Sequence, residues 1–270
     1  MGLISLTSFI GSFGILFWQA RGMKYKIIFL KYVIRNILGR VFPALRREED
    51  WYIEFKDANL WFGASSGELS SLIEIFVRKD YELDPDFIPT DGETVFDIGA
   101  NIGVYTIRQA KRMKNGRIFC FEPNPYAYSR LQKNLQANHL QNVISFDTAL
   151  YSQKCRLPLN FDLNATGRSE LNNGAGKYSS TLSVQTTTMD NMVEAYNIEK
   201  IDLVKIDVEG SEFEVLKGAN KGLRNTDKIV MECHSKELKT LIETFLEYRG
   251  FEKTLEIVGK PLFTLYFRKI

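Results

Sequence analysis

The sequence predicts an α/β protein built around a parallel sheet. Between residues 94 and 248, short apolar strands alternate with helical segments, and this order covers both faces of a parallel sheet with helices. Two apolar runs near the carboxyl terminus flank Gly259-Lys260-Pro261, so we expect the sheet to end in an antiparallel hairpin. The 270 residues, 44% of them hydrophobic, suffice for one large domain and exclude a disordered, collagen-like or disulfide-rich chain.

Each element follows from the local pattern of residues. The expected strands of the sheet are 94–98, 117–121, 143–146, 201–206, 228–233, 251–258 and 262–268, and the expected helices are 104–113, 125–138, 236–248 and one that begins at Ser211. Before them, 51–62 predicts two short strands with a turn, and 68–81 has one apolar helical face. The polar stretch 150–187 has weak strand signals at 157–161 and 181–186. We expect this stretch to be an insertion over the open end of the sheet that contacts substrate.

Charge divides the chain into a basic arm and an acidic body. Residues 1–47 contain eight basic side chains and no acidic one, whereas the remaining residues carry 27 basic against 33 acidic side chains, a formal charge of −6. A negative body does not suit a nucleic-acid partner. We therefore expect three regions: a hydrophobic and basic helical arm at 1–47, a strand-and-helix cap at 48–89, and the main domain at 90–270.

The arm is the part of the chain for which membrane contact must be considered. Residues 2–20 are uncharged, and a spanning helix needs roughly 20 apolar residues, but Gly, Ser and Thr dilute this run, and no basic segment precedes it as in a cleavable signal peptide. Within 24–42, Ile27 and Ile34 share one helical side and Lys24 and Lys31 lie mainly on the other. Two interpretations stay open. Residues 1–42 contact the inner face of a membrane, with the body in the cytoplasm, or the apolar side packs on the domain.

The three cysteines give no sign of a disulfide or a metal centre. Cys120, Cys155 and Cys233 are odd in number and lack C-x-x-C spacing. Two of them fall in apolar strands, which indicates small core residues in a reducing compartment. A catalytic thiol is the alternative.

The strongest functional pattern is Val95-Phe96-Asp97-Ile98-Gly99-Ala100-Asn101-Ile102-Gly103. A strand delivers Asp97, and two glycines let the backbone turn tightly and a ligand approach closely. The free N–H groups of the following helix favour an anionic group such as a carboxylate. The glycine spacing is not the G-x-G-x-x-G of dinucleotide enzymes. A purely structural tight turn is the alternative.

The second pattern is Phe119-Cys120-Phe121-Glu122-Pro123-Asn124-Pro125. Glu122 ends the next strand, 23 residues beyond Gly99, where an acidic side chain can accept hydrogen bonds from both ribose hydroxyls. Asn124 suits a helix N-cap and Pro125 the first helical position. The alternative is an exposed acid at a strand end.

Two further patterns place polar groups at the carboxyl ends of later strands. Val204-Lys205-Ile206-Asp207-Val208-Glu209-Gly210-Ser211-Glu212 delivers Asp207 and Glu209 to the edge where open α/β sheets bind ligands. Ser211 and Glu214 have the spacing of a capping box, and Glu212 is expected to be a first-turn acid favoured by the helix dipole. Strand alternation in Val230-Met231-Glu232-Cys233-His234 puts Glu232 and His234 on one face.

Histidine is the base most suited to neutral pH, and the chain has two. His139 stands near a predicted helix end and is expected at the surface. His234 is therefore the histidine candidate for a general base, with a structural, hydrogen-bonded histidine as its alternative.

Together these patterns resemble the FkbM family of S-adenosylmethionine-dependent methyltransferases. The resemblance covers roughly residues 90–235: DIGANIG, FEPNP, KIDVEGSE with the following Val215-Leu216-Lys217-Gly218, and MECH. It implies a seven-stranded Rossmann-like methyltransferase sheet whose last strand is antiparallel, and O-methylation of a hydroxyl on a sugar, glycan or related small metabolite. Residues 1–47 lie outside the resemblance, and the oligomeric state does not follow from it.

The resemblance also assigns residues to the cofactor, S-adenosylmethionine. It implies that Asp97, Gly99, Asn101 and Gly103 hold the methionine portion, with Thr106 within reach of the same carboxylate; that Glu122 holds the ribose; that Asp147 borders the adenine; and that Asp207 and Glu209 border the transferable methyl group and the substrate.

For the reaction, we expect His234 or Asp207 to accept the hydroxyl proton and Glu232 to orient its neighbour. No resident metal is expected, although Asp207, Glu209, Glu232 and His234 are of the types that bind a divalent cation. Two other functions share parts of the pattern. An NAD-dependent oxidoreductase would share the sheet and Glu122, and a non-catalytic, membrane-tethered cofactor-binding protein would keep the cofactor residues without an acceptor pocket.

Overall fold

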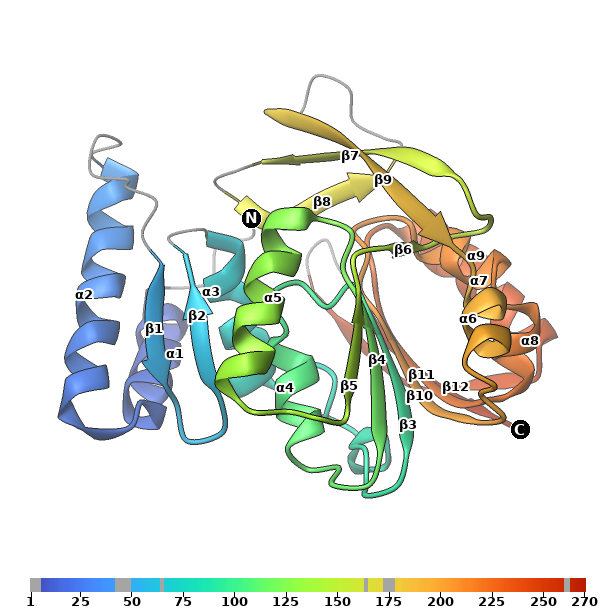
Figure 1. The fold of residues 1–270 in the computed structure, drawn as a ribbon, viewed down its shortest axis with the longest axis horizontal. Coiled ribbons are helices and arrows are strands. Elements are labelled where there is room, and N and C mark those ends of the chain that lie inside the picture. Colours follow the sequence, from blue (N-terminus) through green and yellow to red (C-terminus); the bar gives the residue numbers. More distant parts are fainter. Residues whose placement is uncertain (1–5, 42–49, 64–65, 163–164, 172–177, 260–262) are drawn as a thin grey trace.

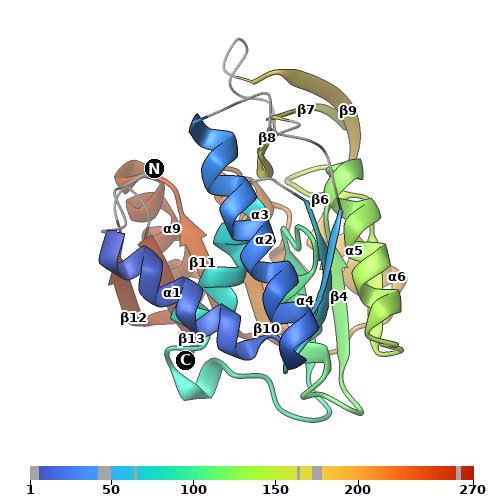
Figure 2. The ribbon, with the colours of Figure 1, turned by 90° about the vertical axis from the view of Figure 1, so that its left-hand side faces the viewer.

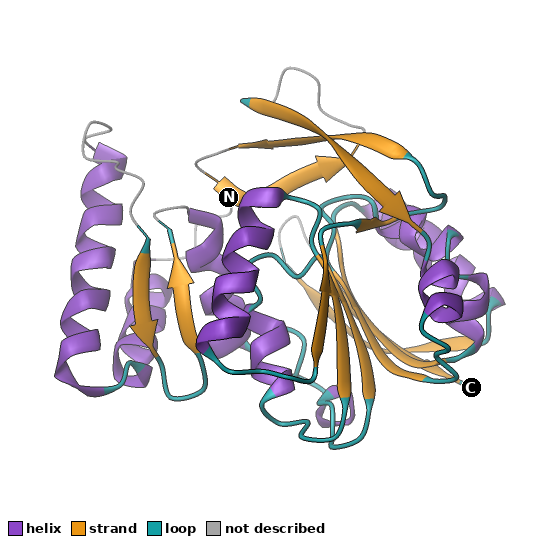
Figure 3. Ribbon diagram, viewed as in Figure 1, coloured by secondary structure: helices purple, strands orange, loops and turns teal. Residues whose placement is uncertain are grey.

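The computed structural model describes residues 6–41, 50–63, 66–162, 165–171, 178–259 and 263–270. The expected turn residues Lys260 and Pro261, and residues 1–5 and 42–49 at the ends of the arm and the start of the cap, lie outside the described residues. The described chain forms a central sheet with helices on both faces, a smaller sheet above one edge, and an amino-terminal layer of helices on one side (Figures 1 and 3).

The central sheet has seven strands in the order β12-β13-β11-β10-β3-β4-β5. Their bounds are β3 Thr94–Ile98, β4 Arg117–Phe121, β5 Val143–Phe146, β10 Ile201–Ile206, β11 Thr226–Cys233, β12 Phe251–Val258 and β13 Phe263–Lys269. The pairs among β5, β4, β3, β10 and β11 are parallel, and β13 is antiparallel to both β11 and β12. The α/β class, the seven-stranded Rossmann-like sheet and its carboxyl-terminal antiparallel hairpin are thus confirmed.

Successive residues of the strands point to opposite faces, and each face has its own apolar core. Val95 and Ile118 belong to the core shared with α4 (Val104–Ala110), α5 (Pro125–Ala137) and the amino-terminal elements. Phe96 and Phe119 belong to the other core, which is covered by the following helices: α6 Met189–Ala195, α7 Glu212–Lys217, α8 Asn220–Arg224 and α9 Lys236–Tyr248. Both faces of the sheet are therefore buried, as the continuous apolar runs of the strands require.

The helix expected at 104–113 is shorter than predicted, because it ends at Ala110. The side chain of Asn142 donates hydrogen bonds to the carbonyl oxygens of Ala110, at 3.0 Å, and Met113, at 2.5 Å. These carbonyls are therefore satisfied without a further helical turn.

The expected insertion forms a four-stranded sheet with the order β6-β9-β7-β8 above the carboxyl edge of the central sheet (Figure 1). Its strands are β6 Ala149–Leu150, β7 Arg156–Asp162, β8 Ala165–Leu171 and β9 Ser180–Thr187. The strand signals at 157–161 and 181–186 are confirmed, whereas the sequence did not predict β8.

The amino-terminal layer consists of α1 (Leu6–Gln19), α2 (Gly22–Val41) and the antiparallel pair β1 (Trp51–Glu54) and β2 (Asn59–Phe62), and Figure 2 shows the two helices side by side. Asn134 of α5 holds β2, because its side chain accepts from Trp61 N at 2.6 Å and donates to Trp61 O at 3.0 Å. Of the helices in the described part of the chain, none combines the length and the hydropathy of a membrane span.

The helix expected at 68–81 is built from two pieces. It begins as α3 (Ser66–Leu72) and continues as the wider π-helix η2 (Ile73–Arg78). Lys79 then adopts a left-handed conformation with φ of 58° and ends the helix. Tyr81 therefore lies beyond the helix, on a segment that leads back to the edge of the central sheet.

Candidate active site

The carboxyl edge of the central sheet collects polar side chains from four strands. Asp97 of β3 is paired in register with Lys205 of β10. Glu122 follows β4, Asp207 follows β10, and Glu232 lies one residue before the end of β11. Parallel strands end at the same edge, so residues more than one hundred positions apart in the chain meet there.

Glu122 connects the loop after β3 to the loop after β4 through hydrogen bonds to its side chain. Its carboxylate accepts one hydrogen bond from Asn101 N at 2.8 Å and another from Asn124 N at 2.9 Å. Burial raises its pKa to about 7, against the opposing effect of these two N–H groups. A carboxyl group with such a pKa changes between its protonated and ionised forms near neutral pH, and hydrogen bonds from a ligand would favour the ionised form.

A pocket opens beside Glu122 and contains about 510 Å³ of space free of protein atoms, including its open mouth. Strand ends of the central sheet form its floor, and Leu159, Ser169 and Leu171 of the small sheet form its roof. Three of the expected cofactor residues, Gly99, Glu122 and Glu209, line it directly. The insertion thus covers this pocket at the carboxyl edge of the sheet.

Asn101 adds an unused polar atom next to Glu122. Its φ is +49°, an unusual value for a residue with a side chain. Its Nδ2 donates to Ser71 Oγ at 3.1 Å, while its buried Oδ1 has no hydrogen-bond partner in the described part of the protein. A buried acceptor without a partner is costly, and a ligand that donates to it would remove this cost.

The two glycines of the first loop are explained by packing as well as by the turn. Gly99 and Gly103 have φ of +83° and +87°. A Cβ on Gly99 would lie 1.7 Å from the carbonyl oxygen of Asp207, and one on Gly103 would lie 2.4 Å from Leu131 Cδ1. The space that the sequence assigned to an approaching ligand is therefore partly taken by the protein itself. Gly99 joins the loops after β3 and β10.

Replacing Gly99 by alanine is expected to lower the free energy of unfolding by about 2–4 kcal/mol, since a clash with backbone adds to the cost of a positive φ. Gly92 is a matched control, because its φ is +87° and a Cβ there would have no neighbour within 4 Å. Gly92→Ala should cost only about 1–2 kcal/mol. Urea unfolding of both variants measures the difference. Equal losses in the free energy of unfolding would show that the close approach of Gly99 to Asp207 does not affect stability.

Asp97 and Thr106 lie beneath the loop rather than on the pocket wall. Both are fully buried, and Thr106 Oγ1 donates to Asp97 Oδ2 at 2.5 Å. The ammonium group of Lys205 lies 3.1 Å from Asp97 Oδ1 and donates to the carbonyl oxygen of Gly99 at 2.8 Å. Their direct contact with a ligand stays a prediction, while in this structure they position the loop that carries Gly99.

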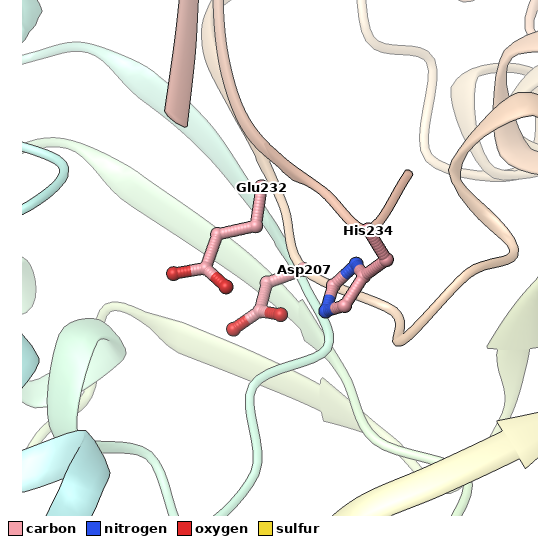
Figure 4. A group of neighbouring side chains, drawn as sticks. All are labelled: Asp207, Glu232 and His234. Atoms are coloured by element: carbon pink, nitrogen blue, oxygen red, sulfur yellow. The ribbon is translucent and has the colours of Figure 1, made fainter. Parts of the chain in front are cut away.

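Asp207, Glu232 and His234 form a cluster whose ligand-type atoms all lie within 4.8 Å of one another (Figure 4). Tyr81 closes the cluster from the cap, because its hydroxyl donates to Asp207 Oδ2 at 3.1 Å. Lys205 approaches the same oxygen to 3.7 Å. Asp207 is thus surrounded by groups that fix its orientation, and its side chain is still 25% exposed.

His234 is held between two carboxylates. Its Nδ1 lies 2.7 Å from Glu212 Oε1, and its Nε2 lies 3.3 Å from Glu209 Oε2. Burial lowers its pKa, but the hydrogen bonds and charges of Glu209 and Glu212 outweigh this effect and raise it to about 12. The ring is therefore an imidazolium near neutral pH, and in this state it cannot accept a proton.

Glu212 is an acid in the first turn of α7, as expected, and it also contacts the cluster. It is fully buried, and besides its contact with His234 it accepts a hydrogen bond from Gly210 N at 2.9 Å. The expected capping box is wrong, since the Ser211 side chain makes no capping hydrogen bond. Glu212 belongs to the site as the residue that orients the imidazole ring.

Two carboxyl groups of the cluster resist ionisation. Burial, together with the charge of Asp207, raises the pKa of Glu232 well above its ordinary value. The same two causes raise the pKa of Glu74, on η2, to about 7. Burial and the neighbouring negative charge therefore favour the protonated form of Glu232 and, in part, of the adjacent Glu74.

One expected cofactor residue lies apart from this site. Asp147 is exposed and does not line the pocket, whereas the nearby Ala149 and Leu150 do. Its contact with a bound ligand remains a prediction.

Sequence reasoning missed four residues of the site: Glu74, Tyr81, Lys205 and Glu212. A signal existed for Lys205, because a lone charge within the apolar run of a central strand must be paired when buried. Tyr81 and Glu74 gave no signal, since Tyr81 meets Asp207 across 126 positions of the chain.

The chain is similar in sequence to known methyltransferases. Residues 97–253 match the model of the Methyltransferase FkbM domain. "Methyltransferase 1" of Beauveria bassiana is 30% identical over 203 residues, which cover 68% of this chain and 80% of that protein. "Hexuronic acid methyltransferase AglP" of Haloferax volcanii is 28% identical over 175 residues (62% and 69%), and "2-O-methyltransferase NoeI" of Sinorhizobium fredii is 28% identical over 158 residues (53% and 64%).

Proposed function

The chain belongs to the FkbM methyltransferase family, and we propose that it transfers a methyl group to a hydroxyl oxygen of a sugar, glycan or related metabolite. Two relatives support the substrate class, one named for a hexuronic acid and one for 2-O-methylation. The observation that carries the proposal is the position of Asp207. This carboxylate belongs to the cluster with Glu232 and His234, and its backbone packs against Gly99 of the ligand pocket.

S-adenosylmethionine is the methyl donor, and it supplies a methyl group bonded to a positively charged sulfur. The residues at the pocket fit this molecule. We assign the ribose hydroxyls to Glu122, whose carboxylate can accept from both, and the donor amino group to the unpartnered Oδ1 of Asn101. The acidic edge formed by Glu122, Asp207 and Glu209 suits a cationic ligand.

In the reaction, Asp207 would accept the hydroxyl proton of the acceptor. Tyr81 donates to Asp207 and Lys205 lies 3.7 Å from it, so the carboxylate is held in one orientation. Glu232 would stay protonated and orient its neighbour, and the His234 cation would fix Glu209. Alignment of reacting groups can contribute about 7–11 kcal/mol, and a general base about 10²–10⁴-fold, so the positioning side chains should weigh at least as much as the base.

A divalent cation bound by Asp207, Glu232 and His234 is the alternative use of the same cluster. Chelation separates the two. Activity that survives dialysis against EDTA removes the metal alternative, while activity lost with EDTA and restored by Mg²⁺ or Mn²⁺ would replace the proton-acceptor role assigned to Asp207.

The state of Glu122 predicts how donor affinity depends on pH. Hydrogen bonds from ribose favour the ionised carboxylate, whose pKa in the unliganded protein is about 7. Above that pH the affinity should be constant, and below it the affinity should fall up to about tenfold per pH unit. Calorimetric titrations from pH 5.5 to 8.5 measure this. Glu122→Gln is the control, because in this variant only the ligand's own groups titrate. If donor affinity fell with the same slope below pH 7 in both proteins, Glu122 would not be the cause of the pH dependence.

The acceptor class is tested with a labelled methyl group. We expect purified protein to move label from S-adenosylmethionine to one member of a panel of hexuronic acids, neutral sugars and cell-envelope glycans, and label that is stable to base excludes a methyl ester. Label in a nitrogen-linked or ester product would contradict O-methylation of a hydroxyl. Donor binding without transfer to any member of the panel would favour the non-catalytic alternative, and binding of NAD in place of the donor would favour the oxidoreductase.

A further inference from the structure

Helix α2 is apolar on two opposite faces. The inner face carries Phe29, Tyr32 and Val33, which are at most 8% exposed. Tyr32 packs edge-on against Phe62 of β2, with ring centroids 4.7 Å apart, and Phe29 packs against Phe55 at 6.1 Å. Tyr25 and Ile28, which flank these residues, also pack against this core, so the inner face makes the contact with the domain.

The outer face of α2 forms an apolar stripe defined by Met23, Ile27, Leu30, Ile34 and Leu38. These residues recur every three or four positions, so they share one side of the helix, and they are 42–68% exposed. Trp18 of α1 is 67% exposed as well. The side of α2 that the sequence offered for packing on the domain is thus the side left uncovered, in the layer that faces the viewer in Figure 2.

Basic side chains flank this stripe. Lys24 and Lys31 are exposed on one side of it, and Lys26 on the other side places its ammonium group 4.2 Å above the ring of Trp18. The first acidic residue of the chain is Glu48. An apolar stripe bordered by cations and an interfacial Trp is the pattern of a helix that lies in the surface of a membrane.

We propose that the outer face of α1 and α2 docks on an anionic lipid surface, with the stripe inserted between headgroups and the lysines at the level of the phosphates. Long basic side chains can keep their charges at that level while their stems lie in the apolar layer. A second copy of the chain is a poorer occupant, because a two-fold pairing of α2 would bring like-charged lysine rows together. The outer face of α2 points away from the sheet, so this docking leaves the carboxyl edge uncovered (Figure 1).

Flotation with vesicles tests the proposal and uses neither methyl donor nor acceptor, so its outcome is separate from that of the proposed function. We expect the full chain to float with vesicles of phosphatidylcholine and phosphatidylglycerol, and to do so less in high salt. Ile27→Glu/Ile34→Glu and Lys24→Glu/Lys31→Glu should each weaken partitioning at least about tenfold. Leu241→Glu on α9 is the matched control, since Leu241 is 46% exposed and Ile27 is 47% exposed, and it should partition like the wild type.

Three results would overturn the proposal. The first is a wild-type protein that stays in the soluble fraction, and the second is a stripe variant that floats as well as the control. The third is a dimer, seen by light scattering in the wild type, that dissociates in Ile27→Glu/Ile34→Glu, because the stripe would then belong to a second copy. Urea unfolding at the wild-type midpoint shows that the variants are folded.

Discussion

Replacing Asp207 by asparagine is expected to lower turnover about 10²–10⁴-fold, the range that a proton-accepting group contributes. Asparagine has the same shape and can keep the contact with the Tyr81 hydroxyl, but it cannot take up a proton. Donor affinity should change far less than turnover, because the contact with the loop of Gly99 comes from the Asp207 backbone, which is unaltered. Single-turnover kinetics with saturating donor and acceptor measures the loss.

His234→Gln is the comparison for this variant. The histidine is already a cation between Glu209 and Glu212, so its loss should affect positioning and lower turnover much less than the loss of Asp207. If His234→Gln abolished turnover while Asp207→Asn retained it within a few-fold, His234 would be the proton acceptor and the assignment would be reversed.

Replacing Lys205 by methionine is expected to destabilise the protein by about 3–5 kcal/mol, the cost of leaving a buried charge without its partner. Lys205 is 3% exposed, and its ammonium group faces Asp97 at 3.1 Å and Asp207 at 3.7 Å. These carboxylates raise the pKa of Lys205 despite its burial. The loss should also open the loop of Gly99, whose carbonyl oxygen accepts from the same ammonium group.

Lys200→Met provides the control at the surface. Lys200 makes two ion pairs, with Asp202 at 2.6 Å and Asp227 at 2.8 Å, but its side chain is 59% exposed. The expected cost is below about 1 kcal/mol. The double variant Asp97→Asn/Lys205→Met removes the charge that Lys205→Met leaves alone, and it should regain part of the lost stability in urea unfolding. Equal losses for Lys205→Met and Lys200→Met would contradict the buried network.

The sheet could be predicted from the sequence because each of its strands is marked by a pattern of neighbouring residues. Each strand is a short apolar run, and each of the four functional patterns sits where such a run ends, so the parallel order alone brings Gly99, Glu122, Asp207 and Glu232 to one edge. Gly99 and Glu122 line the pocket, and Asp207 and Glu232 share the cluster.

The parts that could not be predicted depend on contacts across the chain and on protonation. No local pattern tells that Tyr81 turns back to Asp207, or that Glu212 lies beneath His234 and not in solvent. The raised pKa of His234 follows from its two carboxylate neighbours, Glu209 and Glu212, and no local pattern of the sequence shows that both lie against the ring. The apolar pattern of α2 likewise does not say which face meets the domain, since two faces are apolar.

The site at the carboxyl edge is tested most directly by calorimetric titration. The purified wild-type protein is titrated with S-adenosylmethionine and, separately, with NAD, and the titration with S-adenosylmethionine is repeated on Glu122→Gln. We expect one donor site per chain, no binding of NAD, and at least about tenfold weaker donor binding in Glu122→Gln, since hydrogen bonds to a charged group are worth about 1.5–3 kcal/mol. Binding of NAD without binding of the donor, or equal donor affinity in both proteins, would contradict this expectation.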